Sequence, residues 1–91
     1  MVKDIESASL LSLEILSKSL ESHFKKDIKK ANENIDAVDK LIEKCEKINN
    51  KALNLGIDAV PVVYIVESIR RTGEYSGDIS EHAINYLILK N

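Results

Sequence analysis

Apolar residues recur every three or four positions along almost the whole chain of 91 residues. That spacing is the period of one face of an α-helix, whereas a half-buried strand would alternate apolar and polar residues. The stretches with this period run over 5–24, 28–53 and 59–89. We therefore expect an all-α protein with three long helices, for which the simplest architecture is an antiparallel three-helix bundle.

The clearest boundary between two helices lies around Gly56. Glycine takes a positive φ without steric penalty, so Gly56 suits the position after a helix end, and Ile57 would make the accompanying hydrophobic contact. Asp58 is placed to cap the third helix, and Pro61 is tolerated in its first turn. The other boundary has no glycine or proline, and we expect it within 22–27.

The segment RRTGEYSGD at 70–78 places two glycines inside the third apolar stretch. A glycine inside a helix costs about 0.5–1 kcal/mol relative to alanine, so the segment could instead form a loop. The apolar period continues in phase on both sides, which favours one continuous helix through Gly73 and Gly77. The two glycines lie one turn apart on one helix face. We predict that a neighbouring helix approaches closely there.

Length and composition limit the class of protein. A chain of this length forms one domain over 1–91 with a modest core. The net charge of −2 gives no electrostatic argument for nucleic-acid binding, and no apolar run reaches the roughly 18 residues that span a membrane. The single cysteine, Cys45, fits a reducing cytoplasm and lies in phase with the apolar stripe of its helix. We expect a cytoplasmic protein without membrane insertion, with Cys45 buried.

The sequence offers no arrangement of catalytic groups. It has no nucleophile with a base, no phosphate-cradling glycine loop and no Cys/His spacing typical of a metal site, so we expect no enzymatic activity. The segment KKDIKK at 25–30 could contact phosphate or an acidic partner. Because Asp27 interrupts it and no aromatic residue is interleaved, a solvated helix start is the favoured interpretation. His23 is expected at the surface.

The third apolar stretch resembles a known family. The string ESIRRTGEYSGDISEHAIN at 67–85 is similar to the terminal helix of the PhoU domain, which reads close to leucine, E-R-I-G-D, an aromatic residue or histidine, and D/N-I-A-E. Arg71, Gly73 and Glu74 take the places of the family arginine, glycine and aspartate. The run VDKL at 38–41 resembles the V-D-x-L run of the second PhoU helix, so the resemblance covers nearly the whole chain.

The segment is most similar to the PhoU-like regulators of archaea, and this resemblance implies a cellular role. A PhoU-like module is a cytoplasmic accessory protein of phosphate uptake, without catalysis, that restrains a phosphate transporter and its signalling partner. PhoU proteins carry two three-helix repeats in one chain, whereas this sequence carries one. It is therefore either a lone module or a piece of a longer regulator. The alternative interpretation is a helical oligomerisation domain unrelated to phosphate.

The resemblance also bears on metal binding. PhoU proteins hold iron or other metals on paired E/D-x-x-x-D motifs, because carboxylates four apart on a helix project together. Both motifs are half lost here, since Ile35 stands four residues before Asp39 and Arg70 four residues before Glu74. The ligands that the resemblance leaves are Asp39, Glu74 and Asp78. We expect no cluster of the family type and no resident cofactor.

A residual stripe of metal-ligand types remains on the third helix, formed by Glu74, Asp78 and His82 at spacings of four. One interpretation is a weak site for iron or another divalent metal. The other is a solvated polar face in which Asp78 pairs with His82 near the helix end. The solvated face is the simpler of the two.

The first helix has an unusually wide apolar face over 5–24. Such a face suggests contact with more than one neighbour. We expect a symmetric homodimer, because one surface then serves both subunits, with Leu11 or Ile15 near the interface. The serines are expected to fill the remaining positions of this helix; they include Ser9, Ser12, Ser17 and Ser19.

Overall fold

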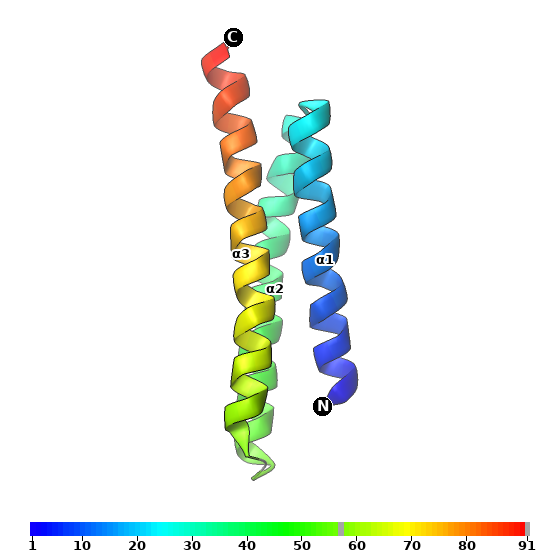
Figure 1. The fold of residues 1–91 in the computed structure, drawn as a ribbon, viewed down its shortest axis with the longest axis vertical. Helices are drawn as coiled ribbons and strands as arrows, with labels where there is room; N and C mark the ends of the chain where they lie inside the picture. The colour runs from blue at the N-terminus through cyan, green and yellow to red at the C-terminus, as the bar shows by residue number, and fades with distance from the viewer. Residues whose placement is uncertain (57, 91) are drawn as a thin grey trace.

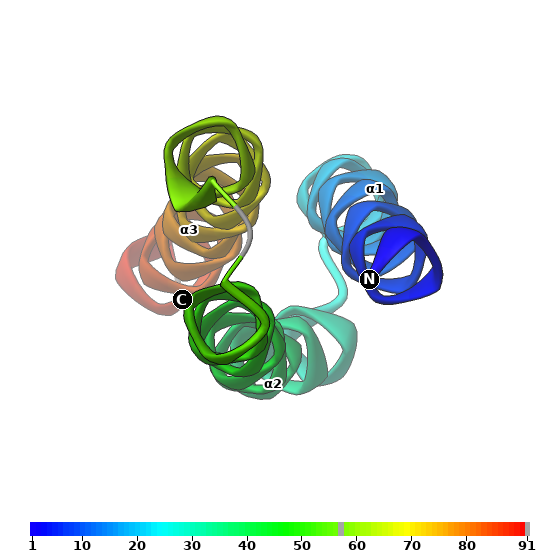
Figure 2. The ribbon, with the colours of Figure 1, turned by 90° about the horizontal axis from the view of Figure 1, so that it is seen from below.

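The computed structural model describes residues 1–56 and 58–90, which form three helices and no strand (Figure 1). Helix α1 spans Val2–Lys25, α2 spans Ile28–Asn54 and α3 spans Ala59–Lys90. The chain runs up, down and up, so α2 is antiparallel to both α1 and α3 (Figure 1). Seen end on, the three helices form a triangle in which each contacts the other two (Figure 2). The predicted three-helix bundle is confirmed.

The bundle is a rod of 54 × 18 × 16 Å. Helix α3 is the longest, and both of its ends project beyond α1 (Figure 1). The core lies along the axis between the helices and includes Val38, Leu41, Cys45 and Ile48 of α2. Each of these four is spaced from the next by three or four residues, as the period of an amphipathic helix requires.

The turn between α1 and α2 is built without glycine. Lys26 takes the left-handed conformation (φ 54°, ψ 45°), and the N–H groups of Lys26 and Asp27 both donate to the Ser22 carbonyl. Asp27 then caps α2, because its carboxylate accepts a hydrogen bond from the Lys30 N–H at 3.0 Å. The boundary predicted within 22–27 is therefore correct, and the acid inside the lysine cluster is the residue that starts α2.

The turn between α2 and α3 follows the sequence prediction where the structure describes it. Gly56 has a φ of 67°, which an L side chain rarely adopts. The Asp58 carboxylate accepts from the Val60 N–H at 3.2 Å, and Pro61 lies in the first turn of α3. The contact predicted for Ile57 lies outside the described residues.

Helix α3 continues without a break through Gly73 and Gly77. Both glycines are buried against α2. A Cβ atom added to Gly73 would collide with the δ2 methyl group of Leu41, and one added to Gly77 would lie 3.1 Å from Cγ2 of Val38. Leu41 is itself fully buried, so its side chain has little room to move aside. Helices α2 and α3 thus make the close approach that the glycine pair predicts.

Helix α1 buries a stripe of mostly small residues: Ala8, Ser12, Ile15, Ser19 and Ser22. The buried hydroxyl groups donate to main-chain carbonyls. Ser12 donates to Ile69 of α3 at 3.2 Å, Ser19 to Leu16 at 2.7 Å, and Ser22 to Ser19 at 3.0 Å. Since each hydroxyl finds an acceptor, burial carries no desolvation penalty, and the short side chains let the helices pack closely. The expectation that the serines fill the outer positions of α1 is wrong for these three.

The two residues expected at a dimer interface lie deeper than the sequence suggested. Ile15 is 1% exposed and belongs to the core, so it lies inside the single chain and not on its surface. Leu11 is partly buried and packs against the same core. Hydrophobicity alone does not show which side of α1 turns inward, and in the structure the inner side is the stripe that contains Ser12, Ser19 and Ser22.

Candidate functional site

The outer side of α2 is polar along most of its length. Between Lys29 and Ala52, every exposed residue of α2 is charged or is asparagine. Several of these charges make ion pairs within the bundle, among them Lys30 with Glu21 of α1 at 2.9 Å. Between Lys29 and Ala52 the outer side of α2 is therefore a solvated polar surface; exposed apolar side chains lie nearer the helix ends, at Ile28 and Leu53.

The outer side of α1 has the opposite character. Apart from Val2 at the helix start, its exposed large apolar residues are Leu10 (67% exposed), Leu13 (57%), Leu20 (42%) and Phe24 (78%). With Ser17 they are spaced by three, four, three and four residues, which is the spacing of a coiled-coil seam. The stripe faces away from the core, because the serine stripe occupies the inner side of the same helix.

Helix α3 adds exposed aromatic and aliphatic residues. Tyr64 is 73% exposed, Tyr75 is 64% exposed and Ile65 is 48% exposed. The tyrosines Tyr64, Tyr75 and Tyr86 follow one another at intervals of eleven residues, which is close to three whole turns, so they share one side of α3. The uncharged residues Ser68, Thr72 and Ile79 lie on that side, together with the exposed Arg71 and His82, each of which follows a tyrosine by seven residues, or about two turns.

These two stripes both lie on the outer surface of the bundle. Ion pairs hold the charged side of α1 against α2, and the hydrogen bond from Ser12 to the Ile69 carbonyl fixes the side of α1 that meets α3. At 100° per residue, both stripes turn outward from the core. Leu10 lies at the edge of the α1 stripe nearest α2, where it borders a hollow together with Ser7 and Lys44. We call this surface the α1–α3 face, and it comprises Leu10, Leu13, Ser17, Leu20, Phe24, Tyr64, Ile65, Ser68, Thr72, Tyr75, Ile79 and Tyr86.

The charged half of the RRTGEYSGD segment forms a small ion-pair network on α3. Arg70 lies 2.7 Å from the Glu67 carboxylate and 3.4 Å from that of Glu74, and Arg71 lies 3.3 Å from Glu67. The hydrogen bond from Arg70 is the main reason that the pKa of Glu67 is lowered. A cation therefore occupies the position at which the PhoU motif has an acid, and it already pairs with Glu74.

The structure does not assemble the candidate metal ligands into a site. Asp39 is exposed on α2, whereas Glu74 and Asp78 are exposed on α3. Within 1–56 and 58–90, no three side chains of His, Cys, Asp or Glu come together in a way that could hold a metal ion. His82 is exposed on α3, and His23 is exposed with its ring edge-on to Phe24, 5.6 Å between ring centres.

The two remaining candidates have structural roles. Cys45 is buried, its thiol donates to the Val66 carbonyl at 3.9 Å, and burial raises the pKa of the thiol. In the lysine cluster, Lys25 and Lys30 both contact Glu21, at 3.0 and 2.9 Å. Hydrogen bonds from Lys30 and then Lys25 lower the pKa of Glu21 to about 2. This pairing joins the end of α1 to the start of α2.

No family model, curated protein or solved structure matches this chain. The similarity to the PhoU domain therefore depends on the residues quoted above and stays a hypothesis. Within the described residues, none of the helices combines the length and apolar character needed to cross a bilayer.

Proposed function

We propose that this chain is a non-enzymatic interaction module that binds protein through the α1–α3 face. The observation that carries the proposal is the orientation of α1, which buries serines and leaves Leu10, Leu13 and Leu20 in water. Large apolar side chains gathered on one exposed surface are typical of protein-binding sites. Their spacing by three and four residues suits a helix as the contacting element.

The occupant that fits this face best is a second copy of the chain. Between Leu10 and Phe24 the stripe on α1 contains no charged residue, so two copies of it meet without like-charge repulsion. The outer side of α2, by contrast, would bring many lysines and acids against their counterparts. A two-fold dimer is the commonest form of oligomer, because one surface serves both subunits.

The resemblance to the PhoU domain supplies the proposed cellular context. It suggests that the module, alone or as a dimer, works in the cytoplasm on a transporter or signalling component of phosphate uptake. The RRTGEYSGD segment supports this context. The half-lost acidic motifs at Ile35 and Arg70 favour the alternative, which is an oligomerisation domain with no link to phosphate.

Affinity capture from phosphate-replete cells tests the proposal. The baits are the wild-type chain, the face variant Leu13→Ser/Leu20→Ser and the control Leu53→Ser/Leu55→Ser. The control makes the same change at two exposed leucines near the α2–α3 turn, 64% and 60% exposed, outside the α1–α3 face. We expect wild type and control to retain further copies of the chain and, bound to the dimer, a component of phosphate uptake. The face variant should lose both, because it does not dimerise.

Two results would count against the proposal. If the face variant retains the same proteins as wild type, the α1–α3 face is not the binding site. If wild type and control retain only further copies of this chain, the oligomerisation domain replaces the phosphate-uptake module as the better account.

A further inference from the structure

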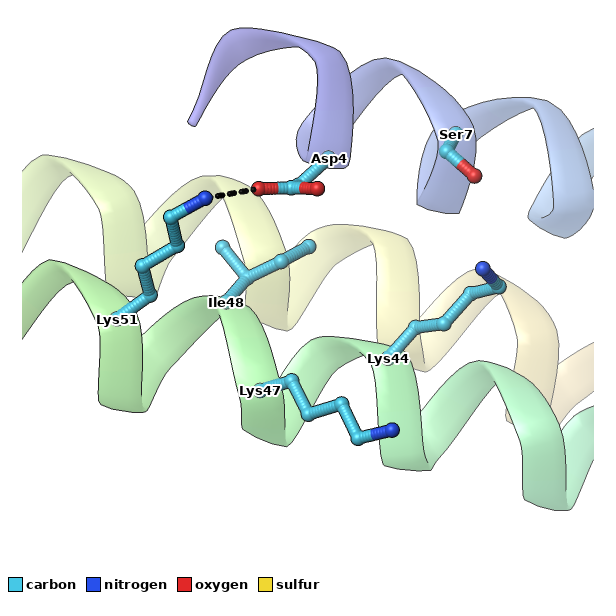
Figure 3. A pocket seen from close by; sticks show the side chains of 6 residues that line it. All are labelled: Asp4, Ser7, Lys44, Lys47, Ile48 and Lys51. Carbon is cyan, nitrogen blue, oxygen red and sulfur yellow. Dashed lines mark hydrogen bonds and ion pairs between the residues drawn. The ribbon is translucent and has the colours of Figure 1, made fainter.

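A cleft of about 260 Å³ lies between the start of α1 and the second half of α2 (Figure 3). It is lined by Asp4, Ser7, Lys44, Lys47, Ile48 and Lys51. Its lining residues include three lysines and one carboxylate, in a chain whose net charge is −2. Figure 3 shows the ammonium groups of Lys44 and Lys51 on the side of α2 that faces α1, whereas that of Lys47 points away from α1. This cleft is thus a positively charged feature on a weakly acidic protein.

The cations of the cleft are only partly neutralised by the protein. Lys51 Nζ lies 3.1 Å from Asp4 Oδ2, and Lys47 Nζ lies 3.4 Å from Glu43 on its own helix. The side chains of Lys44 and Ser7 make no hydrogen bond or ion pair with any part of the chain that the structure describes. Figure 3 shows both of these side chains reaching into the space between α1 and α2.

The other end of the same α1–α2 seam gives an internal comparison. There, Lys18 pairs with Glu14 at 2.9 Å, and Lys25 and Lys30 share Glu21. Every lysine named at that end has an acidic partner, whereas Lys44 in the cleft has none among the described residues. Lys26 and Lys29, near the α1–α2 turn, likewise have no ion pair among the described residues, so an unpaired lysine is not peculiar to the cleft. Lys44 differs from them because it reaches into the space between α1 and α2, where Ser7 and Lys51 also line the cleft.

We propose that this cleft binds a small dianionic oxyanion of the phosphate type. Lys44 and Lys51 supply charge from α2, the Ser7 hydroxyl donates a hydrogen bond from α1, and Ile48 forms an apolar floor. Charge-assisted hydrogen bonds to an oxyanion are stronger than those between neutral groups. The volume exceeds the roughly 30 Å³ that one water molecule occupies in the liquid, so there is room for such an ion.

Asp4 is the only carboxylate among the lining residues of the cleft, and it already accepts a hydrogen bond from the Lys51 ammonium group. An incoming anion competes with Asp4 for that ammonium group. Asp4 thus competes with the anion for Lys51, so removing the charge of Asp4 should strengthen anion binding. The cleft lies between α1 and α2, and Leu10 at the edge of the α1–α3 face borders a neighbouring hollow with Ser7 and Lys44. The anion proposal rests on lysines and a hydroxyl group and not on the apolar stripe, so it does not depend on the proposed docking function.

The test is a titration of the isotope-labelled full chain with inorganic phosphate, followed by NMR at constant ionic strength. Sulfate serves as a second dianion and chloride as the background. We expect saturable shifts centred on Ser7, Lys44 and Lys51. Lys44→Met should weaken binding about fivefold or more, as loss of one charge-assisted contact predicts. The control Lys29→Met removes an equal charge at an exposed position of α2 outside the cleft and should change binding little.

Asp4→Asn separates a built site from general electrostatic attraction. It should tighten phosphate binding, whereas Glu46→Gln, an equal change of charge on the exposed side of α2 away from the cleft, should not. The proposal is overturned if the shifts do not saturate, if Lys44→Met and Lys29→Met weaken binding equally, or if Asp4→Asn has no larger effect than Glu46→Gln. Saturable binding of phosphate but not sulfate would still support the site and would make it selective.

Discussion

Gly73→Ala is the substitution that the packing of α2 and α3 predicts most sharply. In a solvent-facing helix the change would stabilise by about 1 kcal/mol, because alanine has the higher helix propensity. Here the new Cβ atom collides with the δ2 methyl group of Leu41, a fully buried side chain. Overpacking of this kind costs about 1–3 kcal/mol, and the cost should lie at the upper end where the neighbour has no free space. We therefore expect a net loss of about 1–2 kcal/mol in the free energy of unfolding.

A double-mutant cycle identifies the cause of that loss. Leu41→Val moves the branch point from Cγ to Cβ, so neither δ methyl group remains, and the net loss of one carbon should by itself cost about 0.5–1.5 kcal/mol. In the Leu41→Val background, Gly73→Ala should no longer destabilise, so the two changes couple by about 1 kcal/mol or more. Gly77→Ala is the matched control, because its Cβ would lie 3.1 Å from Val38 Cγ2 and needs only a small adjustment.

Urea denaturation followed by circular dichroism measures all four proteins of the cycle and the control. A loss of 1 kcal/mol also lowers the thermal midpoint of a domain of this size by about 4–8 °C, which gives a second readout. If Gly73→Ala raises the stability by the helix-propensity increment, or if the two substitutions are additive, the close approach of α2 to Gly73 is refuted.

Three further predictions concern the α1–α2 turn, pH and metal. Lys26→Gly should raise the free energy of unfolding by about 0.5–1 kcal/mol in urea titrations, because glycine relieves the left-handed conformation at φ 54°. Glu21→Gln should lower the thermal midpoint above pH 4.5. The difference in midpoint between the variant and wild type should shrink as the pH falls toward about 2. The reason is that Lys30 and Lys25 lower the pKa of Glu21 from 4.5 to about 2, so the ion pairs stabilise the folded chain only while the carboxylate is charged. A difference in midpoint that does not change with pH would contradict this. Elemental analysis should find less than one iron or zinc per chain, and chelation should leave the midpoint unchanged, since Ile35 and Arg70 replace two acids; several metals per chain would overturn that expectation.

The course of the three helices could be predicted from sequence because apolar period and turn chemistry agree. Gly56 and Asp58 mark one boundary, and the continuous phase across Gly73 and Gly77 predicts an unbroken α3. The end of α1 was harder, since Lys26 occupies a position usually taken by glycine. Asp27, which caps α2 through Lys30, was the residue that could have located it.

The inner side of α1 could not be chosen from hydrophobicity alone. Leucines surround most of this helix, so two opposite faces both satisfy the helical period. The face that turns inward is set by hydroxyl groups that find carbonyl acceptors and by side chains short enough for close packing, as at Ser12 and Ser19. The spacing of Ala8, Ser12, Ile15, Ser19 and Ser22 by four, three, four and three was the available indication.

The cleft near Asp4 was invisible in the sequence for a different reason. Lys44 and Lys51 are two among many lysines of α2, and nothing local separates them from the rest. Their distinction comes from the antiparallel packing of α1 on α2, which brings Asp4 and Ser7 level with Lys44 and Lys51, residues that are 37 to 47 positions away in the sequence. Such a juxtaposition depends on how far α1 is shifted along α2, and the spacing of apolar residues does not determine that shift.

Sedimentation equilibrium tests the central claim, that the α1–α3 face is a protein-binding surface, most directly. Wild type and the control Leu53→Ser/Leu55→Ser should sediment at micromolar concentration with twice the 10.2 kDa mass of one chain. Leu13→Ser/Leu20→Ser should sediment as a single chain with unchanged helical circular dichroism, because both leucines are already exposed in the folded chain. A wild-type mass of 10.2 kDa throughout, or a dimer that the face variant leaves intact, would contradict the assignment of a second copy to this face.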